Sequence, residues 1–372
     1  MKEKVLVGLS GGIDSSVTAL LLKEAGFDVT GAVVEIWESA PSKEGEVKAW
    51  FERTCCHVPM VEYLCQEILQ IPVVTIPKIE AFRETVVTPF RDGYRSGVTP
   101  NPCTICNAEI KIRTLREKAD ELGIRFVATG HYARKGFSRD GRFWGIQEGR
   151  DQKKDQSYFL SRVSENSLRN VLFPLGEWDK ESVRKFGRSR GFPVDEMVEN
   201  QEACFLSERN VVQFLQKETE KETVKNEPAW LVLTEGGEHL GQIPTGIGLT
   251  RGQRKGLGIA TGTKLYVREI NVGKKEVVLA PKERILENEF IVTETSGYLF
   301  ERGWDRTIRV RFRSTMSPVP CVPVSGDVRA RERRFTLLKE SDGITPGQVA
   351  VFYDTEGVVL GSGILTNERE GH

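Results

Sequence analysis

The chain has 372 residues, a length that predicts two or three domains rather than one. Its 39% hydrophobic and 28% charged residues are typical of a folded globular protein and exclude a disordered one. The 53 basic and 53 acidic residues balance, which excludes a uniformly basic RNA-binding protein but permits local basic faces.

Apolar runs alternate with helical patterns along residues 1–130. The expected strands are 4–9, 29–36, 73–76 and 126–129, and the expected helices are 15–25, 58–68 and 112–122. Strands that alternate with helices in this way predict a parallel sheet covered by helices.

The pattern of apolar residues and glycines changes in the second half of the chain. The polar segment 208–227 predicts a helix that runs into a linker, and short strands separated by glycines follow from about residue 229. These strands are expected at 231–233, 265–270, 276–280, 308–313 and 349–353. The pattern predicts small β-rich domains or barrels. We therefore expect three domains, with bounds 1–207, 208–283 and 284–372.

The N-terminal residues 1–10 contain a short apolar run but lack the long apolar core and cleavage site of a signal peptide. No stretch approaches the length that spans a bilayer. The expected location is therefore the cytoplasm, with no membrane partner. In that reducing compartment the seven cysteines are not expected to form a disulfide framework.

A strand leads directly into the sequence Ser-Gly-Gly-Ile-Asp-Ser at residues 10–15, and a helix follows at once. Glycines let the backbone approach a phosphate, and the N–H groups of such a loop bind an anion together with the helix N-terminus. Ser10, Ser15 and Ser16 add hydroxyl donors, and Asp14 could hold Mg²⁺ or orient the loop. A tight turn capped by Ser or Asp is the structural alternative. The loop resembles the pyrophosphate loop (PP-loop) of enzymes that cleave ATP to AMP and pyrophosphate.

Cys103 and Cys106 form a C-x-x-C motif after an extended, proline-containing approach at residues 97–102. Asn107 is expected to cap a helix that begins there, so that Cys106 lies at the helix N-terminus, where the macrodipole stabilises a thiolate. The motif alone is compatible with a zinc half-site, a redox pair or an Fe–S ligand pair, but the sequence lacks a second ligand pair for zinc. Cys204 is the remaining candidate partner. The other cysteines are interpreted as buried small apolar residues: Cys55, Cys56, Cys65 and Cys321.

Several motifs occur in an order that is specific although each alone is weak. They are residues 10–15, 99–102 with 106–111, 128–132, 154–160, 173–176, 204–205, 252–258 and 345–348. Together they resemble the tRNA-specific 2-thiouridylase family of the PP-loop ATP pyrophosphatase superfamily, along nearly the whole chain. The resemblance implies an α/β fold: a parallel-sheet, adenine-nucleotide α-hydrolase-like (PP-loop) domain, a small central domain and a C-terminal β-barrel.

The resemblance also implies roles for residues at matching positions. Those implied in ATP binding are Gly8, Leu9, Ser10, Gly11, Gly12, Ile13, Asp14, Ser15, Val34 and Gly130. Those implied in tRNA contacts are Asn101, Pro102, His131, Lys154, Asp155, Gln156, Arg311, Phe312 and Gln348. Cys106 corresponds to the first catalytic cysteine of the family and Cys204 to its persulfide-bearing partner, while Cys103 lies in the stretch that faces the target base.

Basic residues of the second half support an RNA partner independently. Arg309, Arg311 and Arg313 alternate along an expected strand and therefore share one face. Two further clusters are Arg251 with Arg254 and Lys255, and Arg329 with Arg331, Arg333 and Arg334. Such clusters can neutralise RNA phosphates, although solvated surface charge is an alternative for the last one.

The implied reaction is ATP-dependent thiolation of the wobble uridine of tRNA at C2, through an adenylated base. The expected cofactors are ATP and Mg²⁺, and the expected partners are tRNA and a sulfur donor, either a persulfide carrier or sulfide, without DNA. Sulfur could come from a persulfide on Cys204, released as Cys106 forms a disulfide. Alternatively, Cys103, Cys106 and Cys204 could bind a 4Fe-4S cluster whose fourth iron holds hydrosulfide. Many family members carry Asp at the position of Cys103, and this additional thiolate favours the cluster.

Three other functions remain open at this point. A thiolase of another RNA or another base would share every motif. A PP-loop ligase or amidotransferase acting on a small metabolite would explain the loop, but not three cysteines and basic β-domains. A catalytically idle RNA-binding protein would not explain the intact phosphate loop.

Overall fold

The computed structural model describes residues 2–37, 58–195, 197, 203–206, 211–220, 228–260, 262–302, 307–324 and 331–366. The chain divides into two compact units. The first comprises Met1–Val86, Cys103–Phe205 and Glu356–Leu360, and the second comprises Val87–Pro102, Leu206–Thr355 and Gly361–His372.

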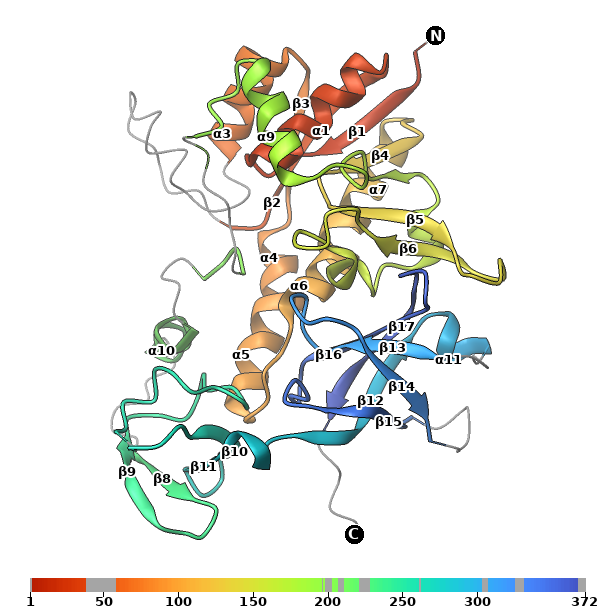
Figure 1. Ribbon diagram of the computed structural model, residues 1–372. Coiled ribbons are helices and arrows are strands. Elements are labelled where there is room, and N and C mark those ends of the chain that lie inside the picture. The colour runs from red at the N-terminus through yellow and green to blue at the C-terminus, as the bar shows by residue number, and fades with distance from the viewer. Residues whose placement is uncertain are drawn as a thin grey trace. The chain divides into compact units, whose positions relative to one another are not determined.

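A five-stranded parallel sheet forms the centre of the first unit, with strand order β3-β2-β1-β4-β7 (Figure 1). Its strands are β1 Lys4–Gly8, β2 Asp28–Glu35, β3 Val73–Pro77, β4 Phe126–Thr129 and β7 Val171–Leu172. The consecutive residues Val5, Leu6 and Val7 are completely buried, which requires that both faces of β1 be covered. The parallel sheet expected from the sequence is confirmed.

Helices of the first unit flank this sheet. They are α1 Ile13–Glu24, α3 Val58–Tyr63, α4 Ile79–Phe82, α6 Pro102–Ile105, α7 Arg113–Glu121, α8 Glu165–Leu168 and α9 Lys180–Ser189. Wider π-helical segments continue three of them, η1 Leu64–Leu69, η2 Arg83–Val87 and η3 Cys106–Ile112, and η4 Ser157–Leu160 is a 3₁₀ turn. Helices α1 and α7 both pack against β1, β2 and β4, and α1 also contacts α9. A hairpin of β5 Ala133–Phe137 and β6 Trp144–Glu148 completes the unit.

The strand order reverses at β1, which pairs with β2 on one side and with β4 on the other. Because the strands are parallel, the carboxyl ends of β1, β2 and β4 meet at one edge of the sheet. Open α/β sheets bind ligands outside this edge, at the point where the order reverses. The loop that follows β1 lies at that point.

A four-stranded sheet in the order β10-β11-β8-β9 forms one part of the second unit. Its strands are β8 Trp230–Thr234, β9 His239–Ile243, β10 Tyr266–Asn271 and β11 Glu276–Ala280. The side chains of Trp230, Val232, Val267 and Val277 are at most 1% exposed and lie in its core. Helices α5 Thr88–Arg95 and α10 Val211–Glu220 belong to the same unit and meet through Phe90 and Phe214.

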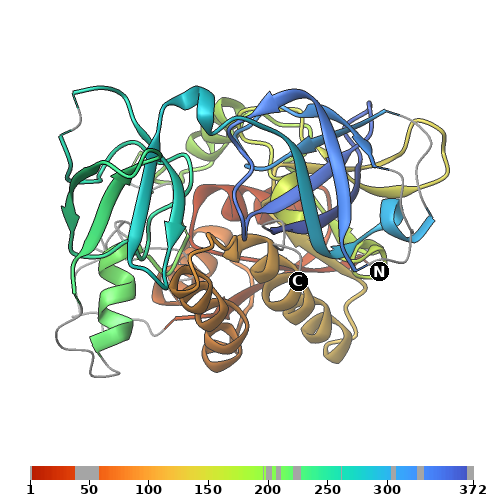
Figure 2. The ribbon, with the colours of Figure 1, turned by 90° about the horizontal axis from the view of Figure 1, so that it is seen from below.

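A closed six-stranded barrel forms the other part of the second unit (Figure 2). In barrel order its strands are β12 Glu287–Ser296, β15 Arg333–Ser341, β14 Val319–Pro323, β13 Ile308–Arg311, β16 Val349–Tyr353 and β17 Val359–Thr366. The short helices η5 Lys282–Arg284 and α11 Tyr298–Arg302 flank β12 in the sequence. Stacked and edge-on rings of Phe290, Phe312, Phe335 and Phe352 lie in the barrel core. The C-terminal β-barrel expected from the resemblance is confirmed.

None of the helices in the described part of the chain combines the length and the apolar character that crossing a bilayer requires.

Candidate active site

The loop after β1 is closed by hydrogen bonds between its own serines. The hydroxyl of Ser15 accepts from the backbone N–H of Ser10 at 3.1 Å and donates to the carbonyl of Gly12 at 3.0 Å. The two hydroxyl oxygens of Ser10 and Ser15 are 3.2 Å apart. Gly11 has a φ of +85°, a conformation that favours glycine, and Gly12 is the N-cap of α1. The loop therefore presents the N-terminus of a twelve-residue helix, which is a site for an anion.

The end of β4 runs against this loop. A β-carbon on Gly130 would lie 2.8 Å from both the carbonyl carbon of Asp14 and the nitrogen of Ser15, so only glycine fits there. Val34, 5% exposed, lies near the carboxyl end of β2. The residues implied in ATP binding thus come from the ends of three neighbouring strands, at the ligand-binding edge of the sheet.

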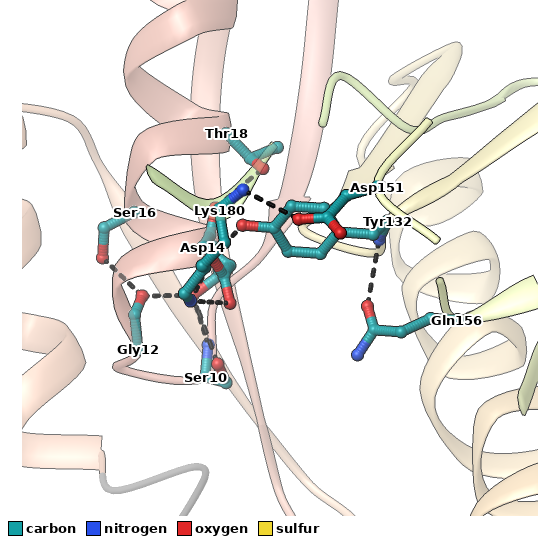
Figure 3. A network of polar contacts seen from close by, with 10 residues as sticks. Ser10, Gly12, Asp14, Ser16, Thr18, Tyr132, Asp151, Gln156 and Lys180 are labelled. Atoms are coloured by element: carbon teal, nitrogen blue, oxygen red, sulfur yellow. Dashed lines mark hydrogen bonds and ion pairs between the residues drawn. The ribbon is translucent and has the colours of Figure 1, made fainter. Parts of the chain in front are cut away.

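The carboxylate of Asp14 is the centre of a polar network (Figure 3). The ammonium group of Lys180 donates to both its oxygens, at 2.8 and 2.9 Å, and the hydroxyl of Tyr132 donates at 2.7 Å. The Lys180 nitrogen also lies 5.9 Å from the centroid of the Tyr132 ring. Sequence reasoning did not single out Tyr132 or Lys180 as functional residues. The structure favours the orienting role of Asp14 over a role as Mg²⁺ ligand, because both of its carboxylate oxygens already accept hydrogen bonds within the protein.

Helix α9 and the preceding loop hold Lys180 in place. Lys180 is the first residue of α9, and its backbone N–H donates to Asp151 at 3.1 Å. Asp179 caps the helix by accepting from the backbone N–H of Ser182 at 2.8 Å, and the hydrogen bonds from Ser182 lower the pKa of Asp179. Two acidic residues thus fix the start of the helix that carries the ammonium group to the phosphate loop.

Residues 154–157 stabilise the surroundings of the Asp14 network through hydrogen bonds. Gln156 accepts the backbone N–H of Tyr132 through its side-chain oxygen at 3.0 Å. The carboxylate of Asp155, 7% exposed, accepts from the backbone N–H of Gly149 at 2.9 Å and from the hydroxyl of Ser157 at 2.8 Å. The side chains of Asp155 and Gln156 therefore maintain the loop beside the site, whereas Lys154 is more exposed than Asp155.

The prediction that Asn107 caps a helix is wrong. The helix begins at Pro102, and α6, η3 and α7 follow one another without a break. Proline is favoured at the first helical position because its missing N–H would have no partner there. Asn107 instead donates its side-chain amide to the carbonyl of Phe159 at 3.3 Å. Cys106 thus lies beyond the first turn, where the helix dipole has little effect on a thiolate, and it begins the π-helical segment η3, a rare turn often found at functional sites.

The three candidate catalytic cysteines all belong to the first unit. Cys106 is buried, and Cys103 and Cys204 are half-buried; all three carry thiols. Across the described residues, which include these three, no group of three or more His, Cys, Asp or Glu side chains is arranged to hold a metal ion. The arrangement of the thiols therefore does not fit the expected 4Fe-4S cluster.

Two other cysteines are confirmed as buried apolar residues. Burial raises the pKa of Cys65 and Cys321 to about 12, so both remain thiols at neutral pH. Cys55 and Cys56 lie outside the described residues.

Comparison with known proteins agrees with this architecture. A family model described as "tRNA methyl transferase HUP domain" matches residues 3–208, and one described as "Aminomethyltransferase beta-barrel domain" matches residues 289–365. The chain is 36% identical to tRNA-specific 2-thiouridylase MnmA 1 of Caldanaerobacter subterraneus subsp. tengcongensis, over 98% of each chain. It is 37% identical to tRNA-specific 2-thiouridylase MnmA 3 of Bacteroides fragilis, over 99% of this chain and 95% of the relative. The chain belongs to the tRNA-specific 2-thiouridylase family.

Some solved structures resemble the chain weakly. A 4-thiouridine synthetase in complex with RNA and ATP is 15% identical, covers 59% of this chain and 51% of its own, and has a TM-score of 0.34. A likeness at this level carries no functional conclusion.

His131 is one of the positions at which the family resemblance implies tRNA contact. Its ring nitrogen Nδ1 lies 2.8 Å from the hydroxyl of Thr129, and its ring meets that of Phe173 edge-on at 6.3 Å. Desolvation by burial, and secondarily the charge of Lys111, lower the pKa of His131 to about 3. The imidazole is therefore neutral at physiological pH, and a contact with RNA would be a neutral hydrogen bond or a stack.

Two further tRNA positions of the family lie inside the second unit. Phe312 is completely buried in the barrel core, and Arg311, 4% exposed, places its guanidinium 5.0 Å from the ring centroid of Tyr353. Arg309 donates to the carbonyl of Asp354 at 2.6 and 3.1 Å. Of the three arginines expected on one face, only Arg313 is thus well exposed, and the side chains of Arg311 and Phe312 are buried.

The other basic clusters differ in exposure. Arg251 pairs with Glu287 at 2.5 Å, whereas Arg254 and Lys255 are exposed. Arg331 and Arg334 are exposed, and Arg329 lies outside the described residues. Asn101 and Gln348, far apart in the chain and both implied in tRNA contacts by the resemblance, are hydrogen-bonded to each other at 3.3 Å.

Proposed function

We propose that this protein replaces the C2 oxygen of the wobble uridine of tRNA with sulfur, at the expense of ATP. The observation that carries the proposal is the full-length similarity to proteins named tRNA-specific 2-thiouridylases, at 36–37% identity. The phosphate loop, with its serines, Gly130 and Lys180, supports the ATP-dependent part of the reaction.

The first step is adenylation of the base. The C2 oxygen attacks the α-phosphorus of ATP, the bond to the β-phosphate breaks, and pyrophosphate leaves. The N–H groups at the start of α1 and the ammonium group of Lys180 offset the negative charge that develops on the phosphates. Asp14 and Tyr132 orient Lys180, and Mg²⁺ would enter with the nucleotide.

The second step delivers sulfur from a persulfide on Cys204. Its terminal sulfur attacks C2 of the adenylated base, and AMP leaves with the former C2 oxygen. The thiolate of Cys106 then attacks the inner sulfur of Cys204, which breaks the persulfide bond, leaves the 2-thiocarbonyl on the base and forms a Cys106–Cys204 disulfide. A thiol reductant must reopen this disulfide, and a persulfide carrier must reload Cys204, before the next turnover.

We further propose that residues 1–207 bind ATP and carry the cysteine chemistry. Residues 208–283 and 284–372 would contribute the tRNA contacts, for which exposed Arg254, Lys255 and Arg313 offer positive charge. A cytoplasmic location, without membrane or DNA partners, remains a prediction.

Nucleoside mass spectrometry tests the proposed function. Protein purified without oxygen is incubated with unmodified tRNA, Mg-ATP and a persulfide-generating desulfurase, and the tRNA is digested to nucleosides. An ATP-dependent 2-thiouridine peak, mapped to the wobble position by fragment analysis, is the expected result. Thiolation at another base or position would replace the proposed substrate. No thiolated nucleoside, together with turnover of ATP on a small metabolite, would support a PP-loop ligase instead.

A further inference from the structure

The turn at residues 345–348 of the second unit holds a segment that lies far away in the sequence. Residues 99–101, just before Cys103, belong to the same unit and contact this turn. The family resemblance implies tRNA contact for Gln348, yet its side-chain amide is engaged within the protein.

Hydrogen bonds within the turn and to β17 fix the conformation of the turn. The backbone N–H of Gln348 donates to the carbonyl of Thr345 at 3.1 Å, and Pro346 and Gly347 occupy the two central positions. Gly347 has a φ of +87°, as the second central residue of such a turn requires. Two backbone hydrogen bonds of 2.8 Å, from Gly347 to Leu365 and from Leu365 to Gln348, fasten the turn to β17.

Three hydrogen bonds join the turn to the segment. The backbone N–H of Thr99 donates to the carbonyl of Pro346 at 2.8 Å. Gln348 donates its side-chain NH₂ to the carbonyl of Thr99 at 3.0 Å and accepts from the amide of Asn101 at 3.3 Å. Because the carbonyl of Thr99 can only accept, the orientation of the Gln348 amide is determined, and Gln348 bridges both ends of the segment.

The backbones of turn and segment also approach closely. A β-carbon on Gly347 would lie 2.9 Å from the nitrogen of Thr99 and 3.0 Å from its carbonyl carbon and oxygen. The hydroxyl of Thr99 donates to that of Thr250 at 3.3 Å, and Tyr94 is hydrogen-bonded to both threonines. Thr99, 6% exposed, is thus held by the barrel turn, by the loop after the four-stranded sheet's β9 and by α5.

We propose that the turn 345–348 is a clamp for the segment 99–101, which leads into the stretch implied to face the target base, and that Gln348 is a positioning residue within it. This inference rests on the proposed function, since it assigns the clamp to thiolation. The segment continues directly into the helix that carries Cys103 and Cys106. Loosening the clamp should therefore reduce turnover by misplacing the segment, while the affinity for tRNA stays nearly the same.

Two variants remove the clamp in different ways. Gln348→Met keeps the length of the side chain but removes both of its hydrogen bonds. Gly347→Ala places a methyl group against the backbone of Thr99 and strains the turn at its positive φ. The matched control is Gln242→Met, at an exposed position of β9. Single-turnover thiolation, the tRNA Kd, and hydrogen exchange of the Thr99 amide without tRNA or ATP are measured for each.

The expected result for Gln348→Met is a thiolation rate lowered about tenfold, a tRNA Kd changed by less than about twofold and faster exchange at Thr99. Gly347→Ala should show the same pattern, and Gln242→Met should match the parent in all three measurements. A raised tRNA Kd with an unchanged rate and unchanged exchange would overturn the proposal and make Gln348 a simple tRNA contact. Hydrogen exchange reports on the clamp even if the parent protein proves not to thiolate tRNA, so failure of the proposed function is distinguishable from failure of the clamp.

Discussion

The phosphate loop of the first unit and the turn 345–348 of the second both place a glycine at positive φ beside hydroxyl-bearing residues, but they are held differently. The serine hydrogen bonds of the phosphate loop join residues at most five positions apart. Gln348, in contrast, reaches a residue 249 positions away. A loop closed by its own side chains can be recognised from a short sequence, whereas a loop defined by a remote partner cannot.

Lys180 provides the strongest test of this difference between the two loops. Through its hydrogen bonds to Asp14, the phosphate loop also depends on a residue 166 positions away. Lys180→Met removes the ammonium group but keeps the stem of the side chain. We expect kcat/KM for ATP to fall about 100-fold, as when one charge-stabilising donor is lost, with little change in the tRNA Kd. Pyrophosphate release measured with saturating tRNA reports the effect.

Lys185→Met is the matched control, since Lys185 is exposed on the same helix. It should retain the activity of the parent. Equal activity of the two variants would show that the network around Asp14 supports the fold and not the nucleotide.

Gly130→Ala tests another remote contact of the phosphate loop. Its methyl group would lie 2.8 Å from the backbone of Asp14 and Ser15, so the loop must shift. We expect the KM for ATP to rise about tenfold, which corresponds to about 1.4 kcal/mol of lost binding. Gly236→Ala is the control, because its nearest neighbour atom would be the Thr234 hydroxyl at 3.8 Å. An unchanged KM would mean that ATP does not use this part of the loop.

Cys103→Ser tests the contribution of the segment 99–103 to thiolation. In the persulfide route only Cys106 and Cys204 exchange sulfur, so a serine of nearly the same volume at position 103 should lower thiolation by about threefold or less. Cys106→Ser provides the contrast and should abolish multiple turnover. Loss of all thiolation in Cys103→Ser, together with iron bound to the parent but not to the variant, would support the cluster route.

Much of the fold could be predicted because many of its elements have a recognisable local sequence pattern. The apolar run of β1, the glycines of the phosphate loop and the spacing of apolar residues in α7 depend on near neighbours alone. The helix start at Pro102 was missed because Asn107 matches a capping residue by type, while its actual partner, the carbonyl of Phe159, is 52 positions away. The burial of Arg311 was missed for the same reason, since it depends on Tyr353 in a neighbouring strand.

The candidate site likewise contains residues that a local pattern identifies and residues that depend on remote partners. Ser10, Asp14 and Ser15 are recognisable from one hexapeptide, but Lys180 and Tyr132 carry no local pattern that marks them as partners of Asp14. The resemblance pointed at Gly130 and Gln348 without giving a physical reason. Gly130 closely approaches the backbone of Asp14 and Ser15, and Gln348 is hydrogen-bonded to Thr99 and Asn101, contacts that only the folded chain defines.

His131 gives the smallest expected effect, and one that concerns stability only. Burial lowers the pKa of its imidazole to about 3, whereas an unfolded chain binds the proton near pH 6.5. Between these values the unfolded state binds about one more proton than the folded state. The free energy of unfolding therefore falls as the pH decreases below 6.5, by about 1.4 kcal/mol per pH unit from this residue.

His131→Gln should flatten the pH dependence of the free energy of unfolding by about that slope, measured by urea denaturation between pH 4.5 and 6.5. His239→Gln is the control for the substitution itself, because His239 is exposed on β9. Equal slopes for the parent and His131→Gln would mean that the imidazole is protonated in the folded protein. In that case the surroundings of His131 would not hold its imidazole neutral below pH 6.5, and the lowered pKa ascribed to burial would be wrong.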